Sequence, residues 1–172
     1  MDYREKHYPS IGNVVVAFQD IDFGVTYLLA SLLNEDGKTV QAIAGSLRFP
    51  EKLKVLQAVA NDKISDQALL ERLNELVKQL NEAKDQRNSV VHGLWINPVK
   101  EVSLGFYKPQ IKKGVFNNFL EVKSDDEIKA IVSIVQEAEK QLREYIGELT
   151  KRGFIKTKHM PFDVTLTRKR SC

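Results

Sequence analysis

The sequence predicts a mainly α-helical protein, a bundle of four to five helices with one inserted β-hairpin. Three long stretches, about residues 10–34, 66–96 and 125–151, repeat apolar residues at alternating three- and four-residue spacing, which is typical of helices that bury one face. Residues 98–123 change to a strand-like alternation around turn-forming residues. The 172 residues, 42% of them hydrophobic and 28% charged, suit one globular domain over residues 1–172.

The first helix is expected over about residues 10–34. Its apolar stripe consists of Ile11, Val14, Phe18, Ile21, Val25, Leu28 and Leu32. Residues 39–47 fit a short strand or a helical turn equally well, so their structure stays open. Pro50 suits the first turn of a second, short helix, because its missing N–H is not needed there, and this helix is expected to end near residues 61–62.

The third helix is expected over residues 66–96, capped by Ser65 or Asp66 and stopped by Pro98. Unbroken, it would be about 45 Å long, enough to extend across a small domain. Its stripe consists of Leu69, Leu73, Leu76, Leu80, Ala83, Arg87, Val90 and Leu94. The hairpin follows, with turn residues at 108–110 and 112–114, and a capping box at Ser124 and Glu127 begins a last helix that ends at residues 151–153.

The cysteine count and the lengths of the apolar runs indicate where in the cell the protein is located. The only cysteine, Cys172, cannot form an intramolecular disulfide, and no uninterrupted apolar run has the length of a membrane span, so we expect a cytoplasmic protein without membrane contact. A basic C-terminal tail begins at about residue 154, since residues 151–172 contain seven basic and one acidic side chain. Such a tail permits contact with nucleic acid, although a short basic terminus is more often solvated chain.

No spacing fits a metal site, a phosphate loop or a nucleophile elbow, so we expect no metal and no cofactor.

Arg87 interrupts the apolar stripe of the third helix. A guanidinium on a packed face requires an anionic partner or a ligand, because an uncompensated buried charge is costly; Asp20 or Asp22 of the first helix is a candidate partner. A polar stripe of Asn81, Asp85, Asn88 and His92 runs beside it. Arg87 and His92 are five residues apart, about 140° around a helix, so we expect their side chains to converge only over a groove or across an interface.

The segment Arg87-Asn88-Ser89-Val90-Val91-His92 resembles the Arg-polar-x-x-x-His motif of HEPN domains. These domains are helical bundles that often act as endoribonucleases, and their paired motifs face each other across a dimer. The resemblance therefore implies a metal-independent endoribonuclease that acts on RNA as a homodimer. At the level of the family it also implies a toxin or defence role, with an antitoxin or regulatory protein as a further partner.

The residue chemistry agrees with this mechanism. RNA can be cleaved by attack of a 2′-OH on the adjacent phosphate, which needs a base, an acid and stabilisation of negative charge. His92 would be the base or the acid, because imidazole changes charge near neutral pH. Arg87 would hold the phosphate, and Asn88 would orient the His92 ring or the ribose. A second copy of the chain would supply the missing histidine.

Substrate binding is assigned to Lys108, Lys112, Lys113 and Trp95, because aromatic and basic residues are mixed there as in single-strand binders. A hairpin with charged ends has the same composition, and Trp95 also fits an anchor of the dimer interface. Two other functions stay open. One is a noncatalytic HEPN-like module that binds a nucleotide or a partner protein through the same residues. The other is a helical scaffold in which Arg87 forms only a structural ion pair.

Overall fold

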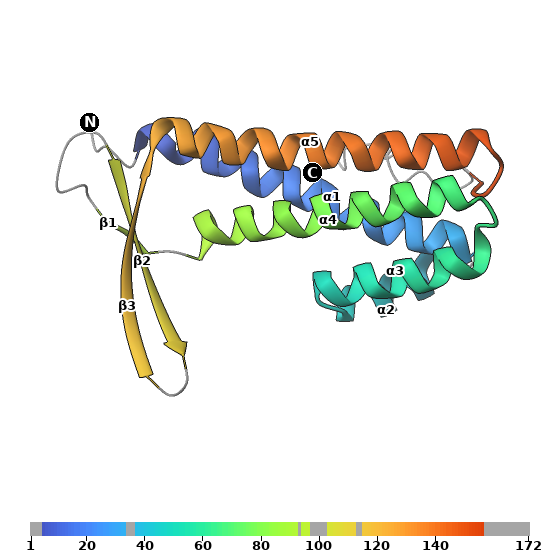
Figure 1. The fold of residues 1–172 in the computed structure, drawn as a ribbon, viewed down its shortest axis with the longest axis horizontal. Helices are drawn as coiled ribbons and strands as arrows, with labels where there is room; N and C mark the ends of the chain where they lie inside the picture. Colours follow the sequence, from blue (N-terminus) through green and yellow to red (C-terminus); the bar gives the residue numbers. More distant parts are fainter. Residues whose placement is uncertain (1–4, 34–36, 93, 97–102, 113–114, 157–172) are drawn as a thin grey trace, which may run out of the picture.

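The computed structural model describes residues 5–33, 37–92, 94–96, 103–112 and 115–156. It is mainly helical, with a β-hairpin inserted before the last helix, as the sequence predicts (Figure 1). The helices are α1 (Tyr8–Leu33), α2 (Gly37–Ser46), α3 (Phe49–Lys63), α4 (Gln67–Val91) and α5 (Asp125–Lys151), with a 3₁₀ turn at Glu5–His7. The strands are β1 (Leu94–Ile96), β2 (Ser103–Lys112) and β3 (Val115–Ser124), antiparallel in the order β1-β2-β3.

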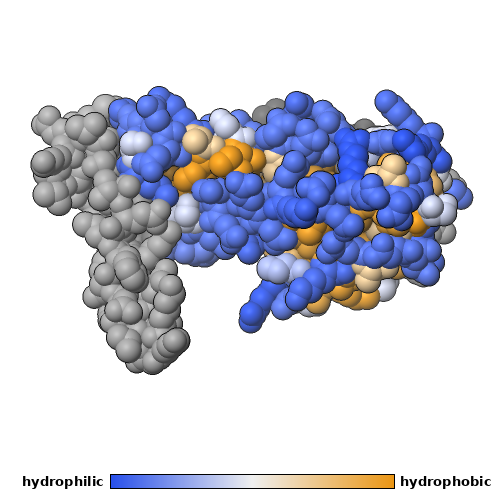
Figure 2. Space-filling view, viewed as in Figure 1, coloured by the Kyte–Doolittle hydropathy of each residue, from blue (hydrophilic) through white to orange (hydrophobic). Residues whose placement is uncertain are grey.

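The long helices α1, α4 and α5 lie side by side, and α2 and α3 pack at the end of the bundle that is remote from the sheet (Figure 1). The apolar stripes predicted for the long helices form one core. Helices α1 and α5 approach closely at Gly24, where a Cβ would meet Leu142 Cδ2 at 2.8 Å, so a larger residue here would require the Leu142 side chain to shift. On the face of the helical bundle shown in Figure 2, most residues are hydrophilic, and apolar residues are visible between them.

Both expected helix starts are confirmed. The Asp66 carboxylate, rather than Ser65, caps α4 by accepting hydrogen bonds from the Ala68 and Leu69 N–H groups at 2.9 and 3.2 Å. The capping box at α5 is also present, because Ser124 Oγ accepts from the Glu127 N–H and Glu127 Oε2 accepts from the Ser124 N–H. Residues 39–47, left open by the sequence, lie mostly in α2, which buries Val40 and Ala44 on one side.

The third predicted helix ends earlier than expected. Helix α4 stops at Val91, and residues 94–96 form β1, so the prediction of an unbroken helix to residue 96 is wrong. The stop falls at a β-branched pair followed by His92 and a glycine, and glycine after a helix is a common termination signal. The predicted turn at residues 108–110 is also wrong: β2 continues through it, with Pro109 opposite Asn118, and residues 113–114 lie outside the described residues.

The basic tail begins as packed chain, since Ile155 is buried and Phe154 lies against the core. The strand considered at residues 164–167 lies outside the described residues.

Segment Glu5–Leu33 is long and apolar enough, by length and composition, to cross a membrane. Many of its apolar side chains, including Ile21, Val25 and Leu28, are buried in the bundle, and a core helix passes the same test. The cytoplasmic location stays a prediction.

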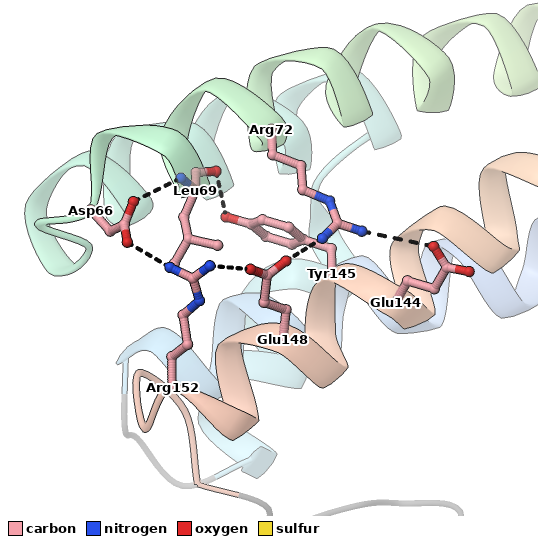
Figure 3. A network of polar contacts seen from close by, with 7 residues as sticks. All are labelled: Asp66, Leu69, Arg72, Glu144, Tyr145, Glu148 and Arg152. Atoms are coloured by element: carbon pink, nitrogen blue, oxygen red, sulfur yellow. Dashed lines mark hydrogen bonds and ion pairs between the residues drawn. The ribbon is translucent and has the colours of Figure 1, made fainter.

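A polar network joins the start of α4 to the end of α5 (Figure 3). The Arg72 guanidinium lies 5.9 Å from the Tyr145 ring centroid and pairs with Glu148, and Arg152 pairs with Asp66 and Glu148. The fully buried Tyr145 donates its hydroxyl hydrogen to the Leu69 carbonyl at 3.2 Å. Arg72 also lies 3.8 Å from Glu144, and these contacts together tie the two helices to each other.

Alkaline unfolding should report on this network. Burial, opposed by Arg72, raises the pKa of Tyr145 to about 12. Since the unfolded chain loses this proton first, near pH 10, the stability that Tyr145 contributes is present below pH 10 and is lost as the pH rises toward 12. We expect the free energy of unfolding, measured by denaturant titration, to fall less between pH 9 and 11.5 for Tyr145→Phe than for wild type. Equal falls in the two proteins would contradict the assignment.

Candidate active site

The motif residues lie at the end of α4, where the helix gives way to β1. Arg87 and Asn88 belong to the last helical turns, whereas His92 is the C-cap residue, with φ −100° and ψ 5°. Its N–H still donates to the Asn88 carbonyl at 3.2 Å, so the backbone remains attached to the helix. The sequence places the motif here because the glycine after His92 favours termination at this point.

Arg87 and His92 are in direct contact within one chain. Arg87 Nη1 lies 2.9 Å from His92 Nε2 and 3.0 Å from Asn88 Oδ1. The expectation that these side chains meet only over a groove or across an interface is therefore wrong. It assumed ideal helix geometry through residue 92, whereas His92 has left the helical conformation.

The contact determines the resting state of the imidazole. A guanidinium has only donors, so His92 Nε2 must be the acceptor, and the neutral ring then has its hydrogen on Nδ1. His92 is exposed, whereas Arg87 is half-buried. A proton acceptor thus lies at the surface, beside a positive charge that the fold partly shields from water.

The guanidinium of Arg87 lies over an aromatic ring of α1. Its Cζ is 5.6 Å from the Phe18 centroid, and Phe18 in turn packs on Phe49 of α3, with centroids 5.0 Å apart and a 57° angle between the rings. A cation over an aromatic face is stabilised by about 0.5–2 kcal/mol, depending on its desolvation. Three helices therefore hold Arg87 in place.

No carboxylate in the described part of the chain lies within 4.0 Å of the Arg87 guanidinium. The two candidates are engaged elsewhere: Asp22 accepts from buried Lys52 at 2.8 Å, and Asp20 lies 3.9 Å from Arg143. Arg87 Nε is buried and has no hydrogen-bond partner among the described residues. Its contacts are therefore a ring, an amide oxygen and a neutral imidazole, which is the environment of a cation that is available to an external anion.

The remaining predicted residues divide into three groups. The Asn88 side chain contacts Arg87 rather than the His92 ring, so in this structure it orients the guanidinium. Asn81 donates to the Val77 carbonyl and Asp85 pairs with Lys84, so these members of the polar stripe do not join the site. Trp95 lies in β1, Lys108 and Lys112 lie in β2, and Lys113 lies outside the described residues.

Sequence reasoning missed Phe18. Phe18 is one of seven apolar members of the α1 stripe, and no local signal separates the residue that supports a guanidinium from those that fill the core.

The contact between buried His7 and Asp125, at 3.3 Å, was not predicted either. Burial lowers the pKa of His7, with Asp125 opposing the effect, and this pair joins the starts of α1 and α5.

Among the described residues, no group of three or more His, Cys, Asp and Glu side chains is placed to hold a metal ion. Comparison with family models, curated proteins and solved structures found no match to this chain. The likeness to HEPN domains therefore rests on the motif, and membership of that family stays a prediction.

The His92 tautomer tests the site geometry without any assumption about function. We expect neutral His92 to have its hydrogen on Nδ1, because Nε2 accepts from Arg87. Two-bond ¹⁵N–¹H correlation spectra distinguish the two tautomers. In Arg87→Met the preference should move toward the Nε2–H form, while His7 should be unaffected. A wild-type His92 with its hydrogen on Nε2 would show that the contact is not formed in solution.

Proposed function

We propose that the chain is a metal-independent endoribonuclease, with Arg87 and His92 as catalytic residues and Asn88 as the residue that orients Arg87. The observation that supports this proposal most is the 2.9 Å contact between Arg87 Nη1 and His92 Nε2, combined with the lack of a carboxylate partner for Arg87 in the described part of the chain. An anion-binding cation and a neutral base thus lie side by side at the surface.

The chemistry follows from these two groups. When a phosphate oxygen accepts from Arg87 Nη1, the lone pair of His92 Nε2 is released and can take the proton of a neighbouring 2′-OH. The 2′-oxygen then bonds to phosphorus and the bond to the 5′-oxygen breaks. The products are a 2′,3′-cyclic phosphate and, once the leaving oxygen is protonated, a 5′-hydroxyl. Arg87 stabilises the charge that develops on the phosphoryl oxygens.

The leaving oxygen needs an acid, and one motif provides one histidine. Within the described residues the other histidine is His7, which is buried and paired with Asp125. We therefore include a homodimer in the proposal, in which His92 of a second copy, displaced from Arg87 by the phosphate and protonated at Nε2 from solvent, donates this proton. A dimer would also bring two Arg87 guanidinium groups to one RNA strand.

A second candidate function uses the same site without turnover. Arg87 over Phe18 can bind the phosphate of a nucleotide whether or not His92 acts as a base. Such a module would be stabilised by phosphate or by a nucleoside monophosphate and would not cleave RNA.

Cleavage in EDTA tests the proposal. We expect wild-type protein to cut mixed-sequence RNA into fragments with cyclic phosphate ends, and His92→Ala to reduce the rate by about 10²- to 10⁴-fold, the usual contribution of a general base. His92 is exposed, so this variant should keep its thermal stability. Arg87→Ala should also lose RNA cleavage. Asp85→Ala is the matched control, because Asp85 is exposed on the same turn of α4 and does not join the site.

Equal cleavage by wild type and His92→Ala would refute the assignment of His92. If wild type does not cleave but phosphate raises its melting temperature in an Arg87-dependent manner, the noncatalytic module is favoured.

A further inference from the structure

The register of the hairpin sorts its residues onto two faces of very different character. Because alternate residues of a strand lie on opposite faces, each cross-strand pair belongs to one face. One face contains the pairs Gly105–Val122, Tyr107–Leu120, Pro109–Asn118 and Ile111–Phe116. We call the other the basic–aromatic face: it contains Leu104–Lys123, Phe106–Glu121, Lys108–Phe119, Gln110–Asn117 and Lys112–Val115, and β1 adds Trp95 opposite Phe106.

The two faces differ in charge. All four charged residues of β2 and β3, namely Lys108, Lys112, Glu121 and Lys123, occupy register positions on the basic–aromatic face, and the other face has none. This is the pattern of an antiparallel sheet with one apolar and one polar face. Aromatic residues are unusual on a polar face, yet three of them, Trp95, Phe106 and Phe119, share it with the lysines.

The register also relates this face to the candidate active site. Leu94, the first residue of β1, pairs with Tyr107, and His92 precedes Leu94 by two residues. Lys108 is the next residue of β2 beyond that pair, on the side from which the chain arrives from α4. Lys112 lies four residues further along, at the last position of β2.

We infer that the basic–aromatic face binds single-stranded RNA and leads it to His92. Lysines and aromatic residues that share one face provide both phosphate contacts and stacking surfaces for bases, the combination that single-strand binders use. This inference rests on the proposed function for its choice of RNA, but its test does not require cleavage.

Binding can be measured on intact His92→Ala protein, which leaves the RNA uncut. A labelled 12-nucleotide RNA of mixed sequence reports binding by anisotropy, and Trp95, the only tryptophan, reports stacking by its own fluorescence. We expect Trp95 quenching to saturate together with the anisotropy. The corresponding duplex should bind at least about tenfold more weakly, because its bases cannot stack on the rings.

Substitutions on the basic–aromatic face should separate the contribution of phosphate contacts to RNA binding from that of base stacking. Lys108→Gln with Lys112→Gln should weaken binding and lower the slope of log K against log salt by about 1.4, or about 0.7 for each phosphate that the protein no longer neutralises. Phe119→Ser should weaken binding by about tenfold, and Phe119→Tyr should restore it because the ring is kept. The matched control is Lys54→Gln with Lys140→Gln, two exposed lysines of α3 and α5 that give the same charge change away from the hairpin.

Three results would overturn the inference: no change in Trp95 fluorescence on binding, equal affinity for the duplex, or equal weakening by the control pair. Self-association through the hairpin in place of RNA binding would overturn it as well. Failure of the proposed function looks different. If RNA binds as described but wild type does not cleave it, the binding face stands and the ribonuclease does not. If wild type cleaves RNA but the hairpin variants bind RNA normally, the ribonuclease proposal stands and the binding face does not.

Discussion

The point at which α4 ends determines most of what is distinctive about this molecule. In an ideal helix, residues 87 and 92 lie about 140° apart around the axis, on different faces. Because the backbone leaves the helix at His92, the imidazole reaches Arg87 Nη1 at 2.9 Å, and two residues later the chain enters β1. The same event thus assembles the site and begins the sheet that lies beside it.

Energetic considerations suggest that Arg87 is not present for stability. Its guanidinium leaves water, one donor remains buried without a partner among the described residues, and its compensation comes from the Phe18 ring, Asn88 and His92. A ring contact of about 0.5–2 kcal/mol is comparable with the cost of one unsatisfied buried donor, about 1–3 kcal/mol. Lys52, by contrast, is a buried cation with a carboxylate partner, because its ammonium contacts both carboxylate oxygens of Asp22.

The sequence predicted those features that depend on local chemistry. The stripes of α1, α4 and α5, the Ser124 capping box and the half-buried Arg87 follow from periodicity and hydrogen-bonding capacity, and the structure contains them. The predicted end of α4 before Pro98 is wrong, because the helix already stops at Val91, close to the glycine that follows His92. Phe18 could not be identified, since its role depends on α1, α3 and α4 meeting, which no single helix encodes.

The site and the basic–aromatic face of the hairpin would have different tasks in one reaction. Arg87 and His92 act on phosphate and ribose, which every nucleotide has, so the motif alone cannot select a sequence. Stacking on aromatic residues is sequence-tolerant, so Trp95, Phe106 and Phe119, which share one face by register, would select unpaired bases over a duplex. Substrate preference would therefore be determined by the hairpin and the capacity for cleavage by α4, with His92 at the junction of the two.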